Sequence, residues 1–300
     1  MKYSKYLMII VVVFLTSCSS NSPNEDTTTP PITTRKFNML INGVDSHLTE
    51  SIYSFAYRDG HTIRIGDDYR HTVGFNMQIT FDENGHFGQM IYKQQLIASD
   101  TPKYFYSGRN YSSQYFTLII QDYDQVNKQI KGTFSGYLYY NPENLNSESK
   151  FVSGSFDLPI LDYVPAVSGL INEADINTQS WRSTNKFQTN GDNTGQYEEL
   201  NLHFLRDDEY KMTFTFHKTT TTAGTYNFTP TTLINKIKFA KYDLNTASYI
   251  NYNCTGTVQI LSRPPLCYDG IYNFTAVNPN DPADIIQVQN GKFRVNYWPY

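Results

Sequence analysis

The residues that could do chemistry in this 300-residue chain are its histidines and its paired aspartates. None of the six histidines has a partner at the spacing of a metal-binding helix or a zinc knuckle: His47, His61, His71, His86, His203 and His217. Adjacent aspartates in a strand point to opposite faces, so Asp67-Asp68 and Asp207-Asp208 do not supply the facing carboxylates of a glycosidase. We interpret them as turn residues, with a calcium site as the alternative.

The chain also lacks the short motifs of common enzyme classes. It contains no Gly-x-Ser-x-Gly elbow, no phosphate-binding loop and no dinucleotide fingerprint. The sequence therefore predicts a protein that is not an enzyme and that uses no metal and no cofactor. A hydrolase with an unrecognised site is the weaker alternative.

A tyrosine-rich segment at 104–115 has the composition of a binding loop. Tyrosine offers a large contact area at low entropic cost, and serine, glycine and asparagine offer adaptable hydrogen bonds. The ligand-binding candidates surround a predicted turn at Ser107-Gly108: Tyr104, Tyr106, Arg109 and Tyr111. The alternative is two ordinary strands with half-buried tyrosines.

Two cysteines, Cys254 and Cys267, could form a disulfide in an exported protein. The predicted hairpin register places Cys267 opposite Ile260, about six residues from Cys254, which is a separation of roughly 20 Å. A disulfide needs about 5.5 Å between Cα atoms. The compartment favours the bond and the geometry opposes it, so both states stay open.

The N-terminus has the layout of an export signal. Lys2 and Lys5 precede the apolar run Leu7–Leu15, which is shorter than the roughly 20 residues that cross a bilayer. The following Leu15-Thr16-Ser17-Cys18 resembles the lipobox of bacterial lipoproteins. This resemblance implies a signal peptide at 1–17, acylation of Cys18 and a membrane lipid as its partner, with an ordinary secretory signal as the alternative. Residues 18–35 then form a polar, flexible tether.

The composition of the chain indicates strands and argues against a nucleic-acid partner. The formal net charge is −4, and no basic cluster supplies the positive footprint that nucleic acid requires. Tyrosine, phenylalanine and threonine are abundant, and they favour strands, while Asn, Gly, Asp and Pro favour the turns between them.

The sequence repeats itself. Asn278 lies 137 positions after Asn141, and Gly291 lies 137 positions after Gly154. Upstream, Gly132-Thr-Phe matches Gly270-Ile-Tyr, and Leu40-Ile-Asn42 matches Leu170-Ile-Asn172. Residues alternate with period two around these motifs. We therefore predict an all-β protein of two tandem homologous antiparallel β-sandwich or barrel domains, at 36–163 and 166–300.

The order of these motifs resembles that of uncharacterised lipoproteins of Bacteroidota with tandem β-domains. The shared features are Asn-Gly after a first strand, as at Asn42-Gly43, then Gly-Thr-Phe, an Asn-Pro turn and a closing Gly-x-Phe. Members of that family often carry Trp soon after Asn-Gly, whereas this chain has none there in the first copy and reaches Trp181 late in the second. The resemblance implies an envelope location and no known chemistry.

Taken together, these patterns predict a lipid-anchored protein of the outer membrane. Its expected function is non-catalytic binding of a carbohydrate or of an envelope protein. The alternative is a structural or assembly component of the cell envelope.

Overall fold

The computed structural model describes the chain in these stretches: residues 35–46, 53–66, 76–95, 99–107, 111–163, 170–191, 198–262 and 267–296. They belong to one compact unit, Thr33–Tyr300. Within it, the strands form two ten-stranded sheets, one from each half of the chain. The all-β, two-domain prediction is confirmed.

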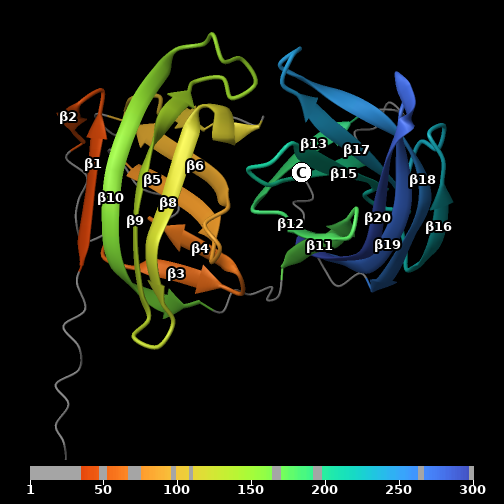
Figure 1. Cartoon of the computed structure of the whole chain (residues 1–300), viewed down its shortest axis with the longest axis horizontal. Coiled ribbons are helices and arrows are strands. Elements are labelled where there is room, and N and C mark those ends of the chain that lie inside the picture. The colour runs from red at the N-terminus through yellow and green to blue at the C-terminus, as the bar shows by residue number, and fades with distance from the viewer. Residues whose placement is uncertain are drawn as a thin grey trace, which may run out of the picture. The chain divides into compact units, whose positions relative to one another are not determined.

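The first sheet contains the strands between Lys36 and Asp162 (Figure 1). In chain order they are β1 (Lys36–Ile41), β2 (Val44–Asp45), β3 (Ala56–Asp59), β4 (Thr62–Ile65), β5 (Asn76–Asp82), β6 (Phe87–Gln94), β7 (Lys103–Tyr106), β8 (Phe116–Asp124), β9 (Gln129–Tyr139) and β10 (Ser149–Asp162). A 3-10 turn, η2 (Ser112–Gln114), precedes β8.

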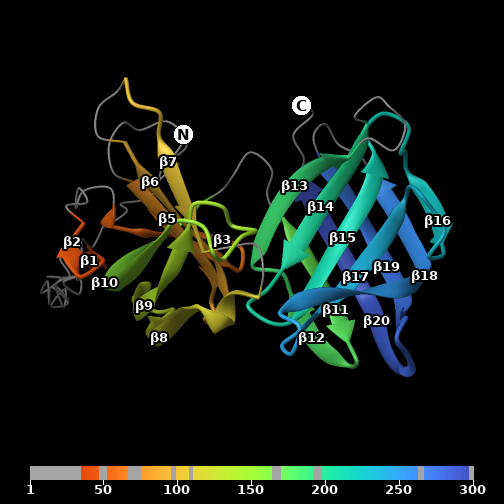
Figure 2. The same ribbon diagram turned by 90° about the horizontal axis from the view of Figure 1, so that it is seen from above.

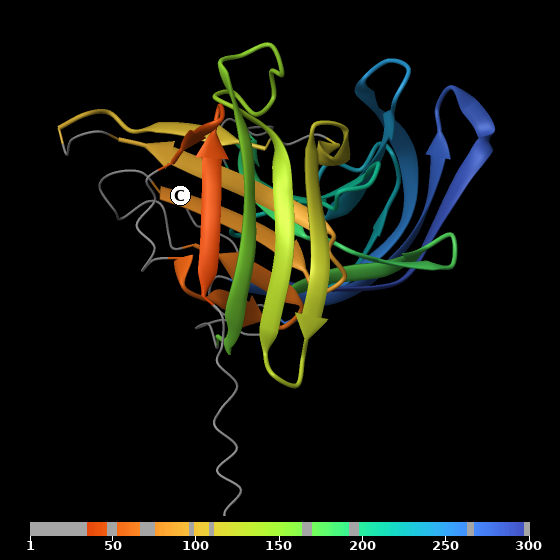
Figure 3. The same cartoon turned by 60° about the vertical axis from the view of Figure 1, so that its left-hand side comes forward.

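The pairings of the first sheet close into a circuit. β9 pairs with β10, the end of β10 pairs with β3, and the path continues through β4, β5, β6 and β7 back to β9. The contact of residues 160–162 with 56–58 is parallel, which adds one parallel step to the predicted antiparallel arrangement. Figure 3 shows two crossed layers, with β1, β10, β9 and β8 in front of the strands from β3 to β6.

The second sheet repeats part of this order. Its strands are β11 (Ile171–Ile176), β12 (Gln179–Arg182), β13 (Asn185–Gly191), β14 (Glu199–Leu205), β15 (Tyr210–His217), β16 (Gly224–Phe228), β17 (Lys236–Asp243), β18 (Ser248–Ser262), β19 (Cys267–Asn278) and β20 (Asp281–Asn296). The order β12-β11-β20-β19-β18 matches β2-β1-β10-β9-β8 of the first sheet.

The second sheet stays open where the first one closes. β18 pairs with β17 through residues 248–252 and with β19 through 253–262, so it belongs to both layers. Figure 2 shows β13, β14, β15 and β17 as one layer, with β18, β19 and β20 behind them. The path ends at β13, and among the described residues no strand pairing joins β13 to β20 or β11.

Side chains alternate between the core and solvent along the long strands. In β9, Ile130, Phe134 and Leu138 are buried, whereas Lys131 and Tyr137 are exposed. This alternation follows from the period of two residues in a strand. The buried side chains form one hydrophobic cluster in each sheet.

Glycines packed under aromatic rings mark equivalent positions in the two sheets. The pairs are Gly132 with Phe156, Gly154 with Phe134, Gly270 with Phe293, and Gly291 with Tyr272. A Cβ added at Gly270 would lie 2.6 Å from the Phe293 ring and 2.2 Å from the Gln259 carbonyl oxygen. These pairs agree with the predicted matches of Gly132 with Gly270 and of Gly154 with Gly291.

One further cross-strand pair consists of a phenylalanine and a glycine in both sheets, but the two residues have exchanged strands. We call it the exchanged Phe–Gly rung. In the first sheet, Phe116 of β8 faces Gly136 of β9. In the second sheet, Gly256 of β18 faces Phe274 of β19. A Cβ at either glycine would lie within 2.7 Å of its aromatic partner.

One predicted match is wrong by five positions. Asn42 has a positive φ of 50°, its N–H donates to the Phe151 carbonyl, and its Oδ1 accepts from the Phe151 N–H. Asn177, with φ 48°, makes the same two bonds to Gln287. The structural counterpart of Asn42 is therefore Asn177 and not Asn172, because the hairpin needs a residue that tolerates the left-handed conformation.

Candidate functional site

The open edge of the second sheet contains a cavity of about 390 Å³, which we call the seam cavity. It lies between β11, the start of β13 and the end of β20, and the β3–β4 turn of the first sheet adds Gly60, His61 and Thr62 to its lining. The equivalent place in the first sheet is closed by the parallel contact of β10 with β3. The seam cavity thus exists because one strand pairing is missing.

Basic side chains line the seam cavity: His61, Arg182, Lys186 and Arg294. No aspartate or glutamate is among the described residues that line it. Apolar contact is offered by Ile171, Phe204 and Val295. Such a lining suits a ligand that has an anionic group and an apolar body.

Lys186 of β13 reaches across the seam cavity to the end of β20. Its Nζ donates to the Asn296 carbonyl oxygen at 2.6 Å and also to the Asn296 side-chain oxygen. Both acceptors are neutral. Burial lowers the pKa of Lys186 to about 8, because desolvation disfavours the charged ammonium. An anion bound beside Nζ would stabilise the protonated form.

Two further donors in the lining are buried without an acceptor. Asn172 is 1% exposed, and its Oδ1 accepts a bond from the Tyr272 hydroxyl at 2.9 Å, whereas its Nδ2 has no partner. The Nε of Arg294 is also unpaired, although its Nη1 lies 4.0 Å from Asp269. A buried donor without an acceptor costs free energy, so an acceptor atom on a ligand would relieve that cost.

Ion pairs join the wall of the seam cavity to the first sheet. His61 Nδ1 contacts the Glu83 carboxylate, and Arg182 Nη1 lies 3.6 Å from the same carboxylate. Arg182 also pairs with Glu173 at 3.3 Å. Glu83 therefore links the β3–β4 turn to Arg182 of the second sheet.

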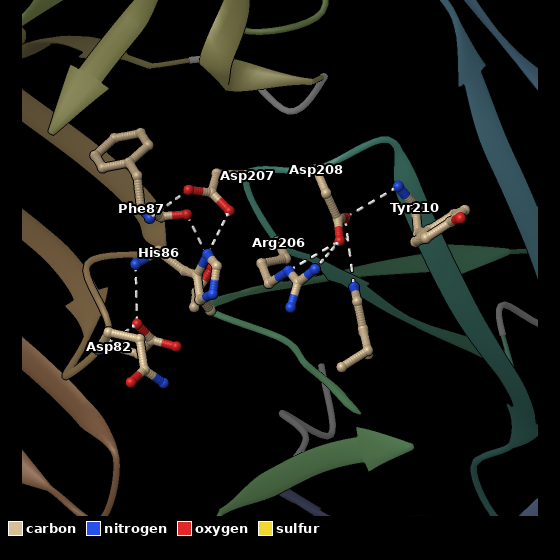
Figure 4. Close-up of polar contacts among 10 residues, drawn as sticks. Asp82, His86, Phe87, Arg206, Asp207, Asp208 and Tyr210 are labelled. Carbon is tan, nitrogen blue, oxygen red and sulfur yellow. Dashed lines mark hydrogen bonds and ion pairs between the residues drawn. The ribbon is translucent and has the colours of Figure 1, made fainter. Parts of the chain in front are cut away.

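A second set of contacts fixes the β14–β15 turn against the start of β6 (Figure 4). One Asp207 oxygen contacts His86 Nδ1 at 3.1 Å, and the other accepts from the Phe87 N–H at 3.1 Å. Thr184 Oγ1 donates to the Phe87 carbonyl at 2.8 Å. Gly88 permits this close approach, because a Cβ there would lie 2.3 Å from the Thr184 carbonyl oxygen.

The neighbouring Asp208 holds the second sheet's own turn. It pairs with Arg206 Nη2 at 2.6 Å and accepts from the Tyr210 N–H at 3.1 Å (Figure 4). The Trp181 indole N–H donates to it at 3.4 Å. Burial raises the pKa of Asp208, while the Arg206 charge opposes that shift. The Asp207-Asp208 pair therefore serves in turn and interface contacts.

Asp207→Ala should lower the free energy of unfolding by about 1–2 kcal/mol, because the His86 and Phe87 donors both lose their acceptor. Asp207→Asn keeps one acceptor oxygen and should cost less. Hydrogen exchange at the Phe87 amide measures the contact directly and should become faster in the alanine variant. Asp122→Ala, at an exposed position of β8, serves as the control. Unchanged exchange at Phe87 would show that Asp207 does not protect this amide.

The structure places three of the four predicted binding residues. Tyr104 and Tyr106 lie on β7 with ring centroids 6.4 Å apart, and both are half-buried. The Tyr111 ring lies 5.6 Å from that of Tyr242 in the second sheet. Arg109 lies outside the described residues, as does Cys18. Tyr104 and Tyr106 thus come together, whereas Tyr111 contacts the other half of the chain.

Cys254 and Cys267 are free, buried thiols, so the disulfide is not formed. The predicted register was wrong: Ile260 pairs with Gly270, and Cys254 pairs with Ala276. Cys267 lies nine residues from Ala276 along β19, or about 30 Å. Burial raises the pKa of both thiols.

Sequence patterns missed the residues of the seam cavity. Lys186, Arg294 and Asn172 occupy ordinary strand positions, and only the pairing of distant strands brings them together. The described part of the chain gathers no group of three or more His, Cys, Asp or Glu side chains that could hold a metal. Among the same stretches, no helix has the length and apolar character to cross a bilayer.

Comparisons with known proteins returned no match: no family model fits the sequence, and no curated protein or solved structure resembles the chain significantly.

Proposed function

We propose that this protein is a lipid-anchored, non-catalytic binding protein of the bacterial outer membrane, and that its seam cavity holds an organic anion with an apolar body. The observation that carries the proposal is the lining of the seam cavity, which combines basic side chains and unpaired buried donors with no described carboxylate. Its volume of about 390 Å³ falls in the range of roughly 300–1,000 Å³ that is typical of small-molecule sites.

The lining assigns the two ends of the ligand. A carboxylate would accept bonds from Lys186, from the unpaired Nε of Arg294 and from Nδ2 of Asn172. The apolar body would contact Phe204 and Val295. Charge-assisted bonds of this kind are stronger than bonds between neutral groups, so the anionic end fixes the ligand's position.

The anchor is the part of the proposal that rests on sequence. Acyl chains on Cys18 would hold the protein on the membrane, with the tether at 18–35 between the lipid and the sheets. At the cell envelope the protein would meet a carbohydrate or an envelope protein, the partners expected from the tyrosine-rich segment at 104–115.

Thermal unfolding of the purified protein with paired compounds tests the cavity. Benzoate and cyclohexanecarboxylate should raise the melting temperature, whereas benzamide and cyclohexanecarboxamide should not, because only the acids carry the charge. A ligand at 100 times its Kd adds about 2.7 kcal/mol of stability. That corresponds to a shift of roughly 4–5 °C in a chain of this size.

Two lysine variants test this assignment, one in the lining of the seam cavity and one outside it as the control. Lys186→Met should weaken acid binding about 10- to 100-fold, while Lys292→Met, at an exposed position of β20, should not. Affinity should fall as the pH rises above about 8, where Lys186 loses its proton, and Lys186→Arg should retain binding there. Equal stabilisation by the acids and their amides would refute the proposal.

A further inference from the structure

The outer face of the second sheet contains another hollow, separate from the seam cavity. It measures about 220 Å³ and lies across strands β13, β14, β15 and β17, with Asn251 of β18 at its edge. We call it the polar groove; its lining includes Thr189, Asn201, His203, Lys211, Thr213 and Lys238. It shares no lining residue with the seam cavity.

Hydrogen bonds between strands fix the floor of the polar groove. His203 contacts the Thr189 hydroxyl through Nε2 at 2.8 Å and the Thr213 hydroxyl through Nδ1 at 2.9 Å. The Phe187 ring stacks on the His203 ring at 4.4 Å with an angle of 17° between the planes. His203 therefore has one orientation, set by two hydroxyls and an aromatic face.

Asn201 continues this polar floor. It is 8% exposed, its Oδ1 accepts from the Thr215 hydroxyl at 2.8 Å, and its Nδ2 donates to Glu199 at 2.7 Å. Register places Thr189, Asn201 and Thr215 side by side on adjacent strands. Thr215 is fully buried, so the polar groups that line the groove on these strands are the Thr189 and Thr213 hydroxyls with Asn201, and a hydroxyl can both donate and accept.

Two lysines stand over this floor, and no aspartate or glutamate is among the described lining residues. Lys211 Nζ lies 4.2 Å from the centroid of the Tyr249 ring, which positions the charge. Burial lowers the pKa of Lys211. Lys238 is exposed on β17 and pairs in register with Thr213. The cations therefore lie beside hydroxyl and amide groups.

We infer that the polar groove binds an acidic sugar unit of a polysaccharide. The lysines would hold its carboxylate or sulfate group, and the threonines and asparagines would exchange hydrogen bonds with its hydroxyls. A bare phosphate ion would use only the donors, whereas a sugar uses the donors and acceptors that the floor presents together. A neutral sugar would leave the two lysines without a role.

The overall charge of the protein makes this inference testable. The formal net charge is −4, so non-specific attraction to a polyanion is opposed and binding requires a local site. Affinity gel electrophoresis of the full-length protein would use polygalacturonate, dextran sulfate and neutral dextran. We expect retardation by one or both acidic polymers and none by dextran. The polymer that retards it identifies the carboxylate or the sulfate as the recognised group.

Variants then locate the binding. Lys238→Gln removes an exposed charge without touching the core and should weaken retardation about tenfold. Lys211→Met with Lys238→Gln should abolish it. Lys131→Gln, at an exposed position in the first sheet, and Lys186→Met in the seam cavity should leave it unchanged.

Two outcomes would overturn the inference: no retardation of the wild type by either acidic polymer, or equal retardation of Lys131→Gln and Lys238→Gln. Because Lys186→Met tests the seam cavity separately, failure of one site does not decide the other.

Discussion

Gly270→Ala is expected to destabilise the second sheet by about 3 kcal/mol. The new methyl carbon would lie 2.2 Å from the Gln259 carbonyl oxygen and 2.6 Å from the Phe293 ring. The carbonyl belongs to the backbone of the paired strand β18 and cannot turn away, so the strands must separate or shift. Urea denaturation followed by circular dichroism measures the loss.

The next residue supplies the control for this change. Ile271 lies on the opposite face of β19 and is 38% exposed, so Ile271→Val should cost well under 1 kcal/mol. Gly132→Ala should behave like Gly270→Ala, since its added carbon would lie 2.5 Å from the Phe156 ring. If both alanine variants unfold at the wild-type urea concentration, the packing of ring on glycine does not limit stability.

Trp181→Ala should cost about 3–5 kcal/mol, the usual range for removing a large buried aromatic side chain. Trp181 is 1% exposed on the short strand β12 and belongs to the core of the second sheet. Its loss leaves a cavity in this core. The free energy of unfolding in urea is again the measurement.

Trp181→Phe separates packing from hydrogen bonding. Phenylalanine keeps most of the apolar volume but loses the indole N–H that donates to Asp208 at 3.4 Å. Because Asp208 keeps its bonds to Arg206 and Tyr210, this variant should lose only about 1 kcal/mol. A cost for Trp181→Ala no greater than that for Trp181→Phe would contradict the core assignment.

Local patterns in the sequence were sufficient for the class of fold. Alternation with period two predicted strands, and the buried Ile130, Phe134 and Leu138 of β9 follow that alternation, whereas Tyr140, just beyond β9, is exposed. The motifs spaced by 137 positions predicted the second sheet. The predicted Asn42–Asn172 match failed because residue identity was compared without the conformation that the turn requires. The parallel contact of β10 with β3 depends on strands about a hundred positions apart, and no local pattern encodes it.

The candidate sites were largely beyond sequence reasoning. Lys186 and Arg294 are 108 positions apart and line the same cavity only because β13 begins where β20 ends. His203 was interpreted as one of several scattered histidines, since the two threonines that orient it lie 14 and 10 positions away on neighbouring strands. The tyrosine-rich segment carried a compositional signal, yet its described tyrosines are half-buried and Phe105 is fully buried.

The exchanged Phe–Gly rung limits how either half of the molecule can change by mutation. Phe116 faces Gly136 in one half and Gly256 faces Phe274 in the other, so the rung fixes the summed volume of two residues and not the identity of either. Single substitutions that convert one arrangement into the other pass through two glycines, which leave a void, or two phenylalanines, which overlap. Each intermediate is less stable than both ends. The two residues of the pair must therefore change together. A fragment grafted from one half into the other would need to carry both strands of the hairpin.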